Sequence, residues 1–192
     1  MKIIITENQY TLLKETKDKP KVYNFPSLDV FGNEDPMDNW NLMLKFLDKK
    51  GNPDFTFTGN LDLKDTPIES LGNLTTVEGN LYLAETPIES LGNLTSVGGY
   101  LYLANTPIKS LGNLTSVGST LHLNESQIES LGNLTSVGKN LDLEYTTIES
   151  LGNLTSVGGS LFLRKTPISE KYTEEEIRSQ VKVEGKIYLW KL

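Results

Sequence analysis

The chain has 192 residues, of which 37% are hydrophobic, and this composition is typical of one soluble domain. The absence of cysteine excludes a disulfide framework and a thiolate metal site. The net charge of −7 disfavours nucleic acid as a partner, because phosphate binding needs clustered lysine and arginine. No apolar run has the length of a membrane span, and the start Met-Lys-Ile-Ile-Ile-Thr-Glu is too short in apolar residues for a signal peptide, so we expect a cytoplasmic protein.

Residues 1–56 do not repeat and are predicted to form an N-terminal cap with two helices and an irregular segment between them. The capping-box spacing of Thr6 and Gln9 predicts a first helix over about 7–17. A second helix is expected from Pro36, capped by Asp35 and ended near Gly51. Its apolar face is expected to cover the first coil of the repeat region, and consists of Trp40, Met43, Leu44 and Leu47.

Residues 57–168 contain one motif five times, with a sixth partial copy. The segment Ser-Leu-Gly-Asn-Leu-Thr recurs unchanged, and a Leu-x-Leu pair returns every 20 residues from Leu61 to Leu161. A fixed period of this length indicates a solenoid, in which each repeat is one coil stacked on its neighbours. The repeat therefore predicts a mainly β solenoid with one parallel sheet and small helical caps.

Each coil places its apolar residues at fixed positions, as Leu81, Leu83, Ile88, Leu91, Leu94 and Val97 illustrate. The alternating Leu-x-Leu pair predicts a short strand whose leucines point inward. The other apolar residues are spaced too irregularly for a helix, and Thr-Pro-Ile and Leu-Gly-Asn contain helix breakers. The return path of each coil is therefore predicted to be extended or turn-like.

Two further columns of polar residues test the stacking. A hydroxyl recurs at one position of every coil, where we expect it to bond turn backbone that is otherwise buried without a partner: Thr66, Thr86, Thr106, Ser126, Thr146 and Thr166. An amide recurs at another, where we expect a ladder at a tight turn: Asn73, Asn93, Asn113, Asn133 and Asn153.

The C-terminal cap is predicted over 169–192, and all three regions are expected to form one structural domain. The segment Val183–Leu189 matches Val77–Leu83 position by position, although Ile187 follows Leu161 by 26 residues rather than 20. The added length contains a capping box at Thr173 and Glu176, which predicts a short helix. We expect a seventh strand to follow it, with Trp190 over the last coil.

The spacing Leu-x-x-Leu-x-x-Val-x-x-x-Leu-x-Leu-x-x-Thr-x-Ile, from Leu91 to Ile108, resembles a leucine-rich repeat, although threonine stands where that family usually has asparagine. The segment Asn-Leu-Thr-Ser-Val-Gly-Gly is similar to the repeats of receptor L domains. The opening residues, Phe25-Pro-Ser-Leu, Gly51-Asn-Pro and Tyr172-Thr-Glu-Glu-Glu-Ile-Arg resemble uncharacterised repeat proteins of tailed bacteriophages. The resemblance implies a right-handed curved solenoid that binds a partner on its concave sheet.

Side chains that flank the leucines of each Leu-x-Leu pair are predicted to point outward, and the coils differ most at these positions. Tyrosine is common at binding hot spots because it buries a large area and keeps a polar tip. We therefore predict that this surface, the aromatic face, binds a partner protein. Its members are Tyr82, Tyr100, Tyr102, His122, Asp142, Glu144 and Phe162.

The aromatic face also fits three alternative roles. Outward strand positions favour aromatic residues for cross-strand packing, so the band is also expected if it serves stability alone. Aromatic rings beside carboxylates suit a carbohydrate-binding surface, and the near-identical coils suit a structural or virion component. The sequence leaves the partner and the oligomeric state open, with a monomer expected.

A second charged column is predicted on the solenoid: Glu69, Glu89, Lys109, Glu129 and Glu149. It could bind a basic partner or a divalent cation, but rows of this kind are commonly a solvated face. The Asn-x-Ser/Thr sequons recur with the repeat and, without a secretory signal, are not expected to carry glycans.

The sequence gives little support for catalysis. His122 is the only histidine, which excludes a multi-histidine metal site. No Walker or dinucleotide-binding glycine pattern occurs, and Asp142 and Glu144 are expected on an open sheet face. We therefore expect a non-enzymatic protein that uses no cofactor or metal.

Overall fold

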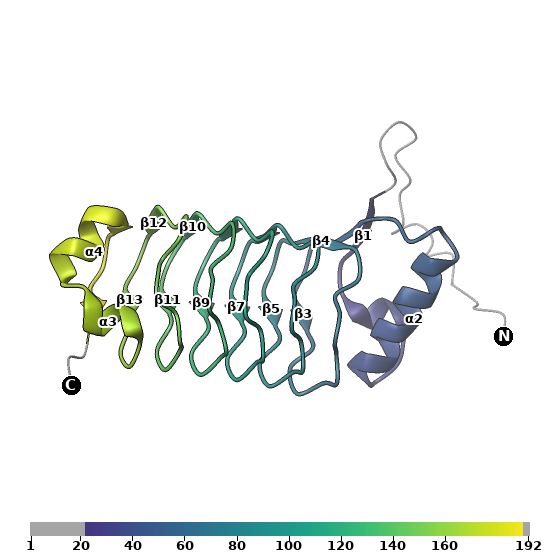
Figure 1. Cartoon of the computed structure of the whole chain (residues 1–192). Helices are drawn as coiled ribbons and strands as arrows, with labels where there is room; N and C mark the ends of the chain where they lie inside the picture. Colours follow the sequence, from purple (N-terminus) through teal and green to yellow (C-terminus); the bar gives the residue numbers. More distant parts are fainter. Residues whose placement is uncertain (1–21, 190–192) are drawn as a thin grey trace.

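The computed structural model describes residues 22–189 and has the predicted β-solenoid architecture (Figure 1). The coils stand side by side in a row, with helical segments at both ends. The predicted helix over 7–17 and the predicted position of Trp190 lie outside the described residues.

The predicted Leu-x-Leu strands form a seven-stranded parallel sheet within the described part of the chain. Equivalent residues of successive coils are paired, as Leu81 with Leu101 and Tyr82 with Tyr102. The predicted seventh strand is present and pairs with the sixth through Leu161 and Ile187. The strands are β3 (Leu61–Asp62), β5 (Leu81–Tyr82), β7 (Leu101–Tyr102), β9 (Leu121–His122), β11 (Leu141–Asp142), β13 (Leu161–Phe162) and β15 (Ile187–Tyr188).

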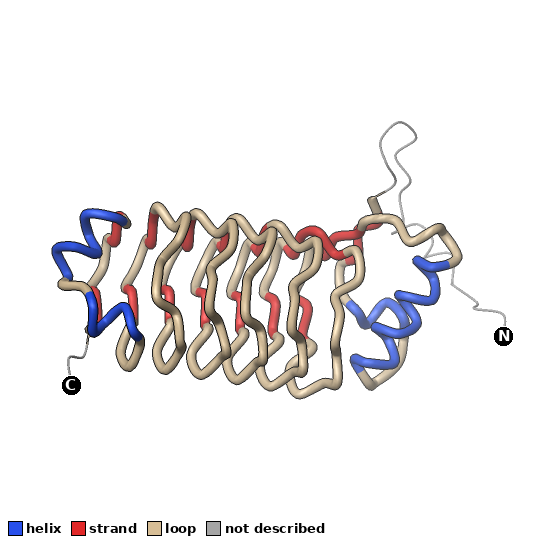
Figure 2. The backbone as a smooth tube through the Cα atoms, viewed as in Figure 1, coloured by secondary structure: helices blue, strands red, loops and turns tan. Residues whose placement is uncertain are grey.

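The prediction of a single sheet was incomplete, because the return path of each coil also pairs with its neighbours. Figure 2 shows the two rows of strands that result. The second sheet has eight parallel strands among residues 22–189. They are β1 (Tyr23–Phe25), β2 (Phe55–Phe57), β4 (Leu74–Val77), β6 (Ser96–Val97), β8 (Ser116–Val117), β10 (Ser136–Val137), β12 (Ser156–Val157) and β14 (Lys182–Val183).

A threonine hydroxyl before each of the strands β6, β8, β10 and β12 reinforces this pairing. Thr115 Oγ1 donates to the carbonyl of Thr95 at 2.9 Å, and Thr135 Oγ1 donates to that of Thr115 at 3.0 Å. Only the valine of each Ser-Val strand points into the core. The alternation is thus two residues long, too short for the period of a strand to be recognised in the sequence.

The solenoid interior is filled by the predicted leucines. Both leucines of every Leu-x-Leu pair are 0% exposed, and the buried side chains of the caps and coils form one continuous hydrophobic cluster. Burial of this kind is the main stabilising contribution to folding, and each coil obtains part of it from its neighbours.

The hydroxyl column behaves as predicted. Each hydroxyl donates to the carbonyl of the second strand leucine three residues earlier, at 2.5–2.7 Å. The residue before the hydroxyl has a left-handed backbone in every coil, with φ between 55° and 60°, as at Glu85 and Tyr145. Since this conformation is unfavourable for residues other than glycine, the hydroxyl bond helps to hold a strained turn.

The asparagine column also spans the coils, but mainly through backbone groups. The side-chain amides of Asn113 and Asn153 donate to the carbonyls of Gly92 and Gly132 at 3.2 and 3.0 Å. An amide-to-amide contact of the predicted kind joins Asn93 to Asn73 at 3.4 Å.

The N-terminal cap contains the predicted second helix, α2 (Pro36–Asp48), which follows the 3-10 helix η1 (Leu28–Phe31). Asp35 caps α2 by accepting from the backbone of Met37 at 2.7 Å. Trp40, Met43 and Leu47 are buried, as the predicted apolar face requires, while Leu44 is half-buried. The helix ends before Gly51, which has φ +85° in the turn that follows.

The C-terminal cap contains two helices, α3 (Pro167–Lys171) and α4 (Glu174–Gln180). The capping box predicted at Thr173 and Glu176 is present at the start of α4. Helix α3 was not predicted from the sequence, and Thr166 caps it by accepting from the backbone of Ser169 at 3.2 Å. None of the helices within residues 22–189 combines the length and the apolar character that a membrane span needs.

Candidate partner-binding face

The aromatic face lies on the outward side of the seven-stranded sheet. The central column of this side consists of the outward residue of each strand, and the sheet register places these residues opposite one another: Asp62, Tyr82, Tyr102, His122, Asp142, Phe162 and Tyr188. All seven predicted site residues are half-buried and none belongs to the core. The structure therefore places each of them where the Leu-x-Leu pattern predicts.

Four of the predicted residues form one continuous cluster of rings. Tyr82 stacks on Tyr102 with ring centroids 5.1 Å apart, and Tyr102 stacks on His122 at 4.5 Å. Tyr100 joins from the neighbouring column, with its ring 5.9 Å from that of Tyr102. Parallel strands lie about 4.8 Å apart, so rings at equivalent positions stack face to face. The stack therefore covers ring faces and leaves ring edges and polar tips outward.

A second pair of rings lies further along the sheet. Phe162 stacks on Tyr188 with centroids 4.6 Å apart, and the guanidinium of Arg164 lies 5.3 Å from the Tyr188 ring. Asp142 stands between this pair and the first cluster, so the predicted band is divided in two. The prediction did not include Tyr188, although its place in the copied segment Ile187-Tyr-Leu189 was the signal that could have identified it.

Charged side chains from neighbouring strands lie close together where the two ring clusters are separated. Asp142 Oδ2 lies 3.8 Å from Nδ1 of His122, which makes an ion pair when the imidazole is protonated. Glu144 Oε1 lies 3.5 Å from Nε of Arg164. Burial raises the pKa of the Glu144 carboxyl, and the negative charge of Asp142 raises it further, while Arg164 partly opposes both. This part of the face therefore holds a carboxyl that protonates more readily than a free one.

The phenol of Tyr102 stays neutral over an even wider pH range than a free tyrosine. Burial is the main cause that raises its pKa, and the neighbouring phenols of Tyr82 and Tyr100 add to it. The hydroxyl of Tyr82 is held in place, because the side-chain amide of Asn80 donates to it at 2.9 Å. The cluster thus offers a fixed hydroxyl at Tyr82 and an uncharged phenol at Tyr102, and both can donate and accept hydrogen bonds.

A polar column beside the rings bonds successive coils together. The side-chain oxygen of Asn60 accepts from the backbone of Asn80 at 2.9 Å, and that of Asn140 accepts from Ser160 at 2.8 Å. Thr120 and Ser160 do the same for the coils that follow them, at 3.4 and 3.2 Å. Tyr100 occupies this column but has no oxygen near its Cβ, so it cannot make the equivalent bond. The column therefore loses a bond between coils where the face gains a ring.

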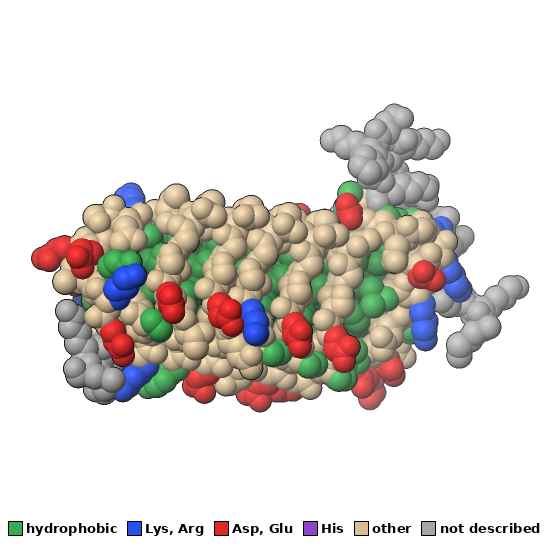
Figure 3. Space-filling view, viewed as in Figure 1, with side chains coloured by type: hydrophobic (Ala, Val, Ile, Leu, Met, Phe, Trp, Pro, Cys, Tyr) green, Lys and Arg blue, Asp and Glu red, His purple; other side chains and the backbone are tan. Residues whose placement is uncertain are grey.

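The acidic column is exposed and only weakly paired. Lys109 Nζ lies 3.6 Å from Glu129 Oε1, with both side chains more than 60% exposed. Figure 3 shows acidic side chains in a row along the coils, with a basic one among them. Exposed pairs of this kind contribute little to stability, and the row has the character of a solvated face. Within residues 22–189, no three His, Asp or Glu side chains gather closely enough to hold a metal ion.

The comparisons with known proteins do not assign the chain to a family. No protein-family model matches the chain, and neither a curated protein nor a solved structure matches it. What the chain is can be stated from its architecture alone: it is a repeat protein with a parallel β-solenoid of 20-residue coils.

Proposed function

We propose that the aromatic face binds a partner protein and that the chain is a non-enzymatic interaction module. The support comes from a comparison among coils of the same chain. The interior and the turns are nearly copied from coil to coil, whereas the outward positions of the seven-stranded sheet change in size, charge and polarity. A scaffold that keeps everything else constant gives those positions freedom to serve recognition.

The observation that carries the proposal is Tyr100. The register explains the stack of Tyr82, Tyr102 and His122 without any partner, because equivalent rings on adjacent strands stabilise each other. It does not explain Tyr100, which stands where Asn60, Asn80, Thr120, Asn140 and Ser160 bond the next coil. A residue that gives up a bond between coils in order to enlarge an outward cluster is expected when that cluster has a ligand.

The stacking geometry favours a protein over a carbohydrate. Sugars bind aromatic residues by lying flat on exposed ring faces, and Tyr102 has a ring on each side. Outward ring edges with polar tips are instead suited to a protein surface, where tyrosine contributes both area and hydrogen bonds. A glycan array is expected to give no specific hit, and a specific hit would favour the carbohydrate alternative.

The finer identity of the module is part of the same proposal. We infer from the spacing of Leu91–Ile108 that the coils are leucine-rich repeats, and from the resemblance to tailed-phage repeat proteins that the module acts on a host protein in the host cytoplasm. Affinity capture from host lysate followed by mass spectrometry tests for that partner, and mass spectrometry of purified virions tests the structural alternative.

The decisive variant is Tyr100→Asn, which restores the residue type found at this position in other coils. It is expected to leave the free energy of unfolding unchanged or slightly higher, because Asn can accept the backbone N–H of Thr120. Capture of the partner is expected to fall at least tenfold. The control is Tyr145→Asn, which removes an exposed tyrosine from a turn outside the sheet. Equal capture by Tyr100→Asn and the unaltered chain would move the binding site away from this cluster.

A further inference from the structure

Within residues 22–189, no further coil bonds the outer edge of β14. In interior coils the carbonyl of the strand valine accepts from the next coil, as Val157 accepts from Glu184 at 3.0 Å. The carbonyl two residues further on does the same, as Gly159 accepts from Gly185 at 2.8 Å. The carbonyls of Val183 and Gly185 occupy these two positions in the last coil, where a further coil would supply the donors.

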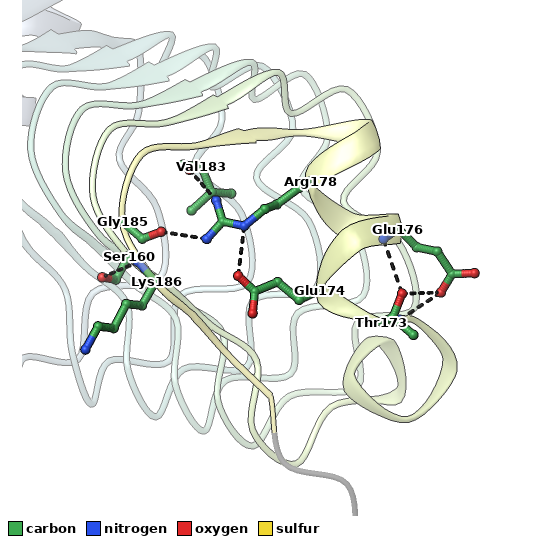
Figure 4. Close-up of polar contacts among 8 residues, drawn as sticks. All are labelled: Ser160, Thr173, Glu174, Glu176, Arg178, Val183, Gly185 and Lys186. Carbon is green, nitrogen blue, oxygen red and sulfur yellow. Dashed lines mark hydrogen bonds and ion pairs between the residues drawn. The ribbon is translucent and has the colours of Figure 1, made fainter.

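Arg178 supplies both missing donors from within the chain. Its Nη1 donates to the Val183 carbonyl at 2.6 Å and its Nη2 donates to the Gly185 carbonyl at 2.8 Å. Its Nε donates to Glu174 at 2.8 Å, one turn earlier on α4, which fixes the direction of the guanidinium (Figure 4). The planar fork of arginine can bridge two acceptors in a way that lysine cannot. One side chain thus replaces two backbone N–H groups of an absent coil.

Among the described residues, the other end of the same sheet is β1, and it lacks a donor at the matching position. The sheet register aligns Phe25 with Phe57 and Phe57 with Val77, and Thr58 donates to the Phe25 carbonyl at 2.9 Å. Pro26 follows Phe25 as Thr58 follows Phe57, so it holds the position of the donor to a preceding coil. Proline has no N–H, so a strand placed before β1 in this register would leave its carbonyl without a partner.

We propose that Arg178 and Pro26 together prevent the solenoid of one chain from continuing into that of a second copy. An uncovered strand edge is a template for pairing with another chain, and a stack that ends in a parallel strand at both ends is prone to open-ended head-to-tail growth. Arg178 occupies the acceptors at the C-terminal edge, and Pro26 removes the donor that an in-register second copy would bring to Val183. The ion pair between Lys182 and Glu184, at 2.6 Å, adds charge to the same edge.

Disulfide trapping in the full chain tests this proposal, because the chain has no cysteine of its own. Asn24 and Lys182 occupy equivalent positions in the register of the eight-stranded sheet. If β1 of a second copy paired with β14, Asn24 would lie opposite Lys182 with Cα atoms about 5 Å apart, a distance that a disulfide can bridge. Asn24→Cys with Lys182→Cys is combined with Arg178→Ala, with Pro26→Ala and with both. A ladder of covalent multimers is expected with Arg178→Ala, at concentrations about tenfold lower when Pro26→Ala is added.

The controls distinguish two roles of Arg178: preventing a second copy from pairing with β14, and only stabilising the folded chain. The same cysteine pair with Arg178 and Pro26 intact is expected to stay monomeric, and either single cysteine with Arg178→Ala is expected to give no ladder. Circular dichroism reports whether each variant keeps the solenoid. A folded Arg178→Ala chain that stays monomeric overturns the proposal, and so does an unfolded one without multimers, because Arg178 would then act on stability alone. Neither result depends on whether the aromatic face binds a partner.

Discussion

The two sheets of the solenoid are built from the same coils but differ in what they show to solvent. Four strands of the eight-stranded sheet, β6, β8, β10 and β12, repeat serine and valine followed by glycine without change, and hydroxyls and backbone groups bond these coils to one another. The seven-stranded sheet keeps its inward leucines constant in six of its strands, whereas its outward side chains differ in size and charge among the strands. The eight-stranded sheet thus maintains the stacking of the coils, which leaves the outward residues of the seven-stranded sheet free to vary.

The largest expected effect on the free energy of unfolding comes from adding a side chain where the coils of the eight-stranded sheet approach closely. A Cβ on Gly138 would lie 2.1 Å from the carbonyl oxygen of Gly118, and this coil is held by neighbours on both sides. Gly138→Ala is therefore expected to lower the free energy of unfolding by roughly 3 kcal/mol, measured by urea denaturation. Glu78 and Glu184 have side chains at the equivalent position, in the first and last copies of the Val-x-Gly segment, so the crowding applies to the coils between them.

Gly112→Ala is the matched control for this substitution. Gly112 has φ +56° but no atom within 4 Å of an added Cβ, so the change is expected to cost only about 1–2 kcal/mol of backbone strain. Equal losses for the two variants would show that close approach between coils does not govern the glycines of the eight-stranded sheet.

A smaller effect on the free energy of unfolding is expected when a ring is removed from the seven-stranded sheet. Tyr102→Ala removes the ring between Tyr82 and His122 and is expected to cost about 1–2 kcal/mol by urea denaturation. Ser136→Ala, on the other sheet, is expected to change the free energy of unfolding by less than about 0.5 kcal/mol. If Tyr102→Ala were as neutral as Ser136→Ala, the ring stack would contribute nothing to coil pairing.

The smallest effect concerns the pH dependence of stability that Glu144, on the seven-stranded sheet, produces. Because the folded pKa of Glu144 is raised, its folded state binds a proton more readily than the unfolded chain does. Glu144 thus favours folding below its ordinary pKa of 4.5, and this contribution is lost as pH rises through the raised value. Glu144→Gln is expected to raise the melting temperature slightly at pH 7 and to leave it unchanged near pH 4.

Thermal melts at a series of pH values check this sign. The loss of the ion pair with Arg164, which is 44% exposed, is expected to offset only part of the gain, since such pairs are screened by solvent. A variant less stable than the unaltered chain at pH 7 would show that the ion pair outweighs the burial of the carboxyl.

Much of this architecture could be read from the sequence because the repeat fixes local periodicity. The inward direction of the leucines, the hydroxyl bond from Thr106 to Leu103 and the capping box at Thr173 follow from spacings of two or three residues. The outward placement of the seven site residues follows from the same alternation. The helix over Pro36–Asp48 was recognisable because its cap and first-turn proline are local signals too.

The tertiary structure decided everything that depends on how one coil lies on the next. The second sheet, the interruption of the ring column by Asp142 and the loss of a bond at Tyr100 all depend on register between residues 20 apart. Arg178 reaches its two carbonyls only because α4 folds back over the last coil. Sequence periodicity sets which side of the chain a residue faces, whereas its partners are set by stacking, which no single coil contains.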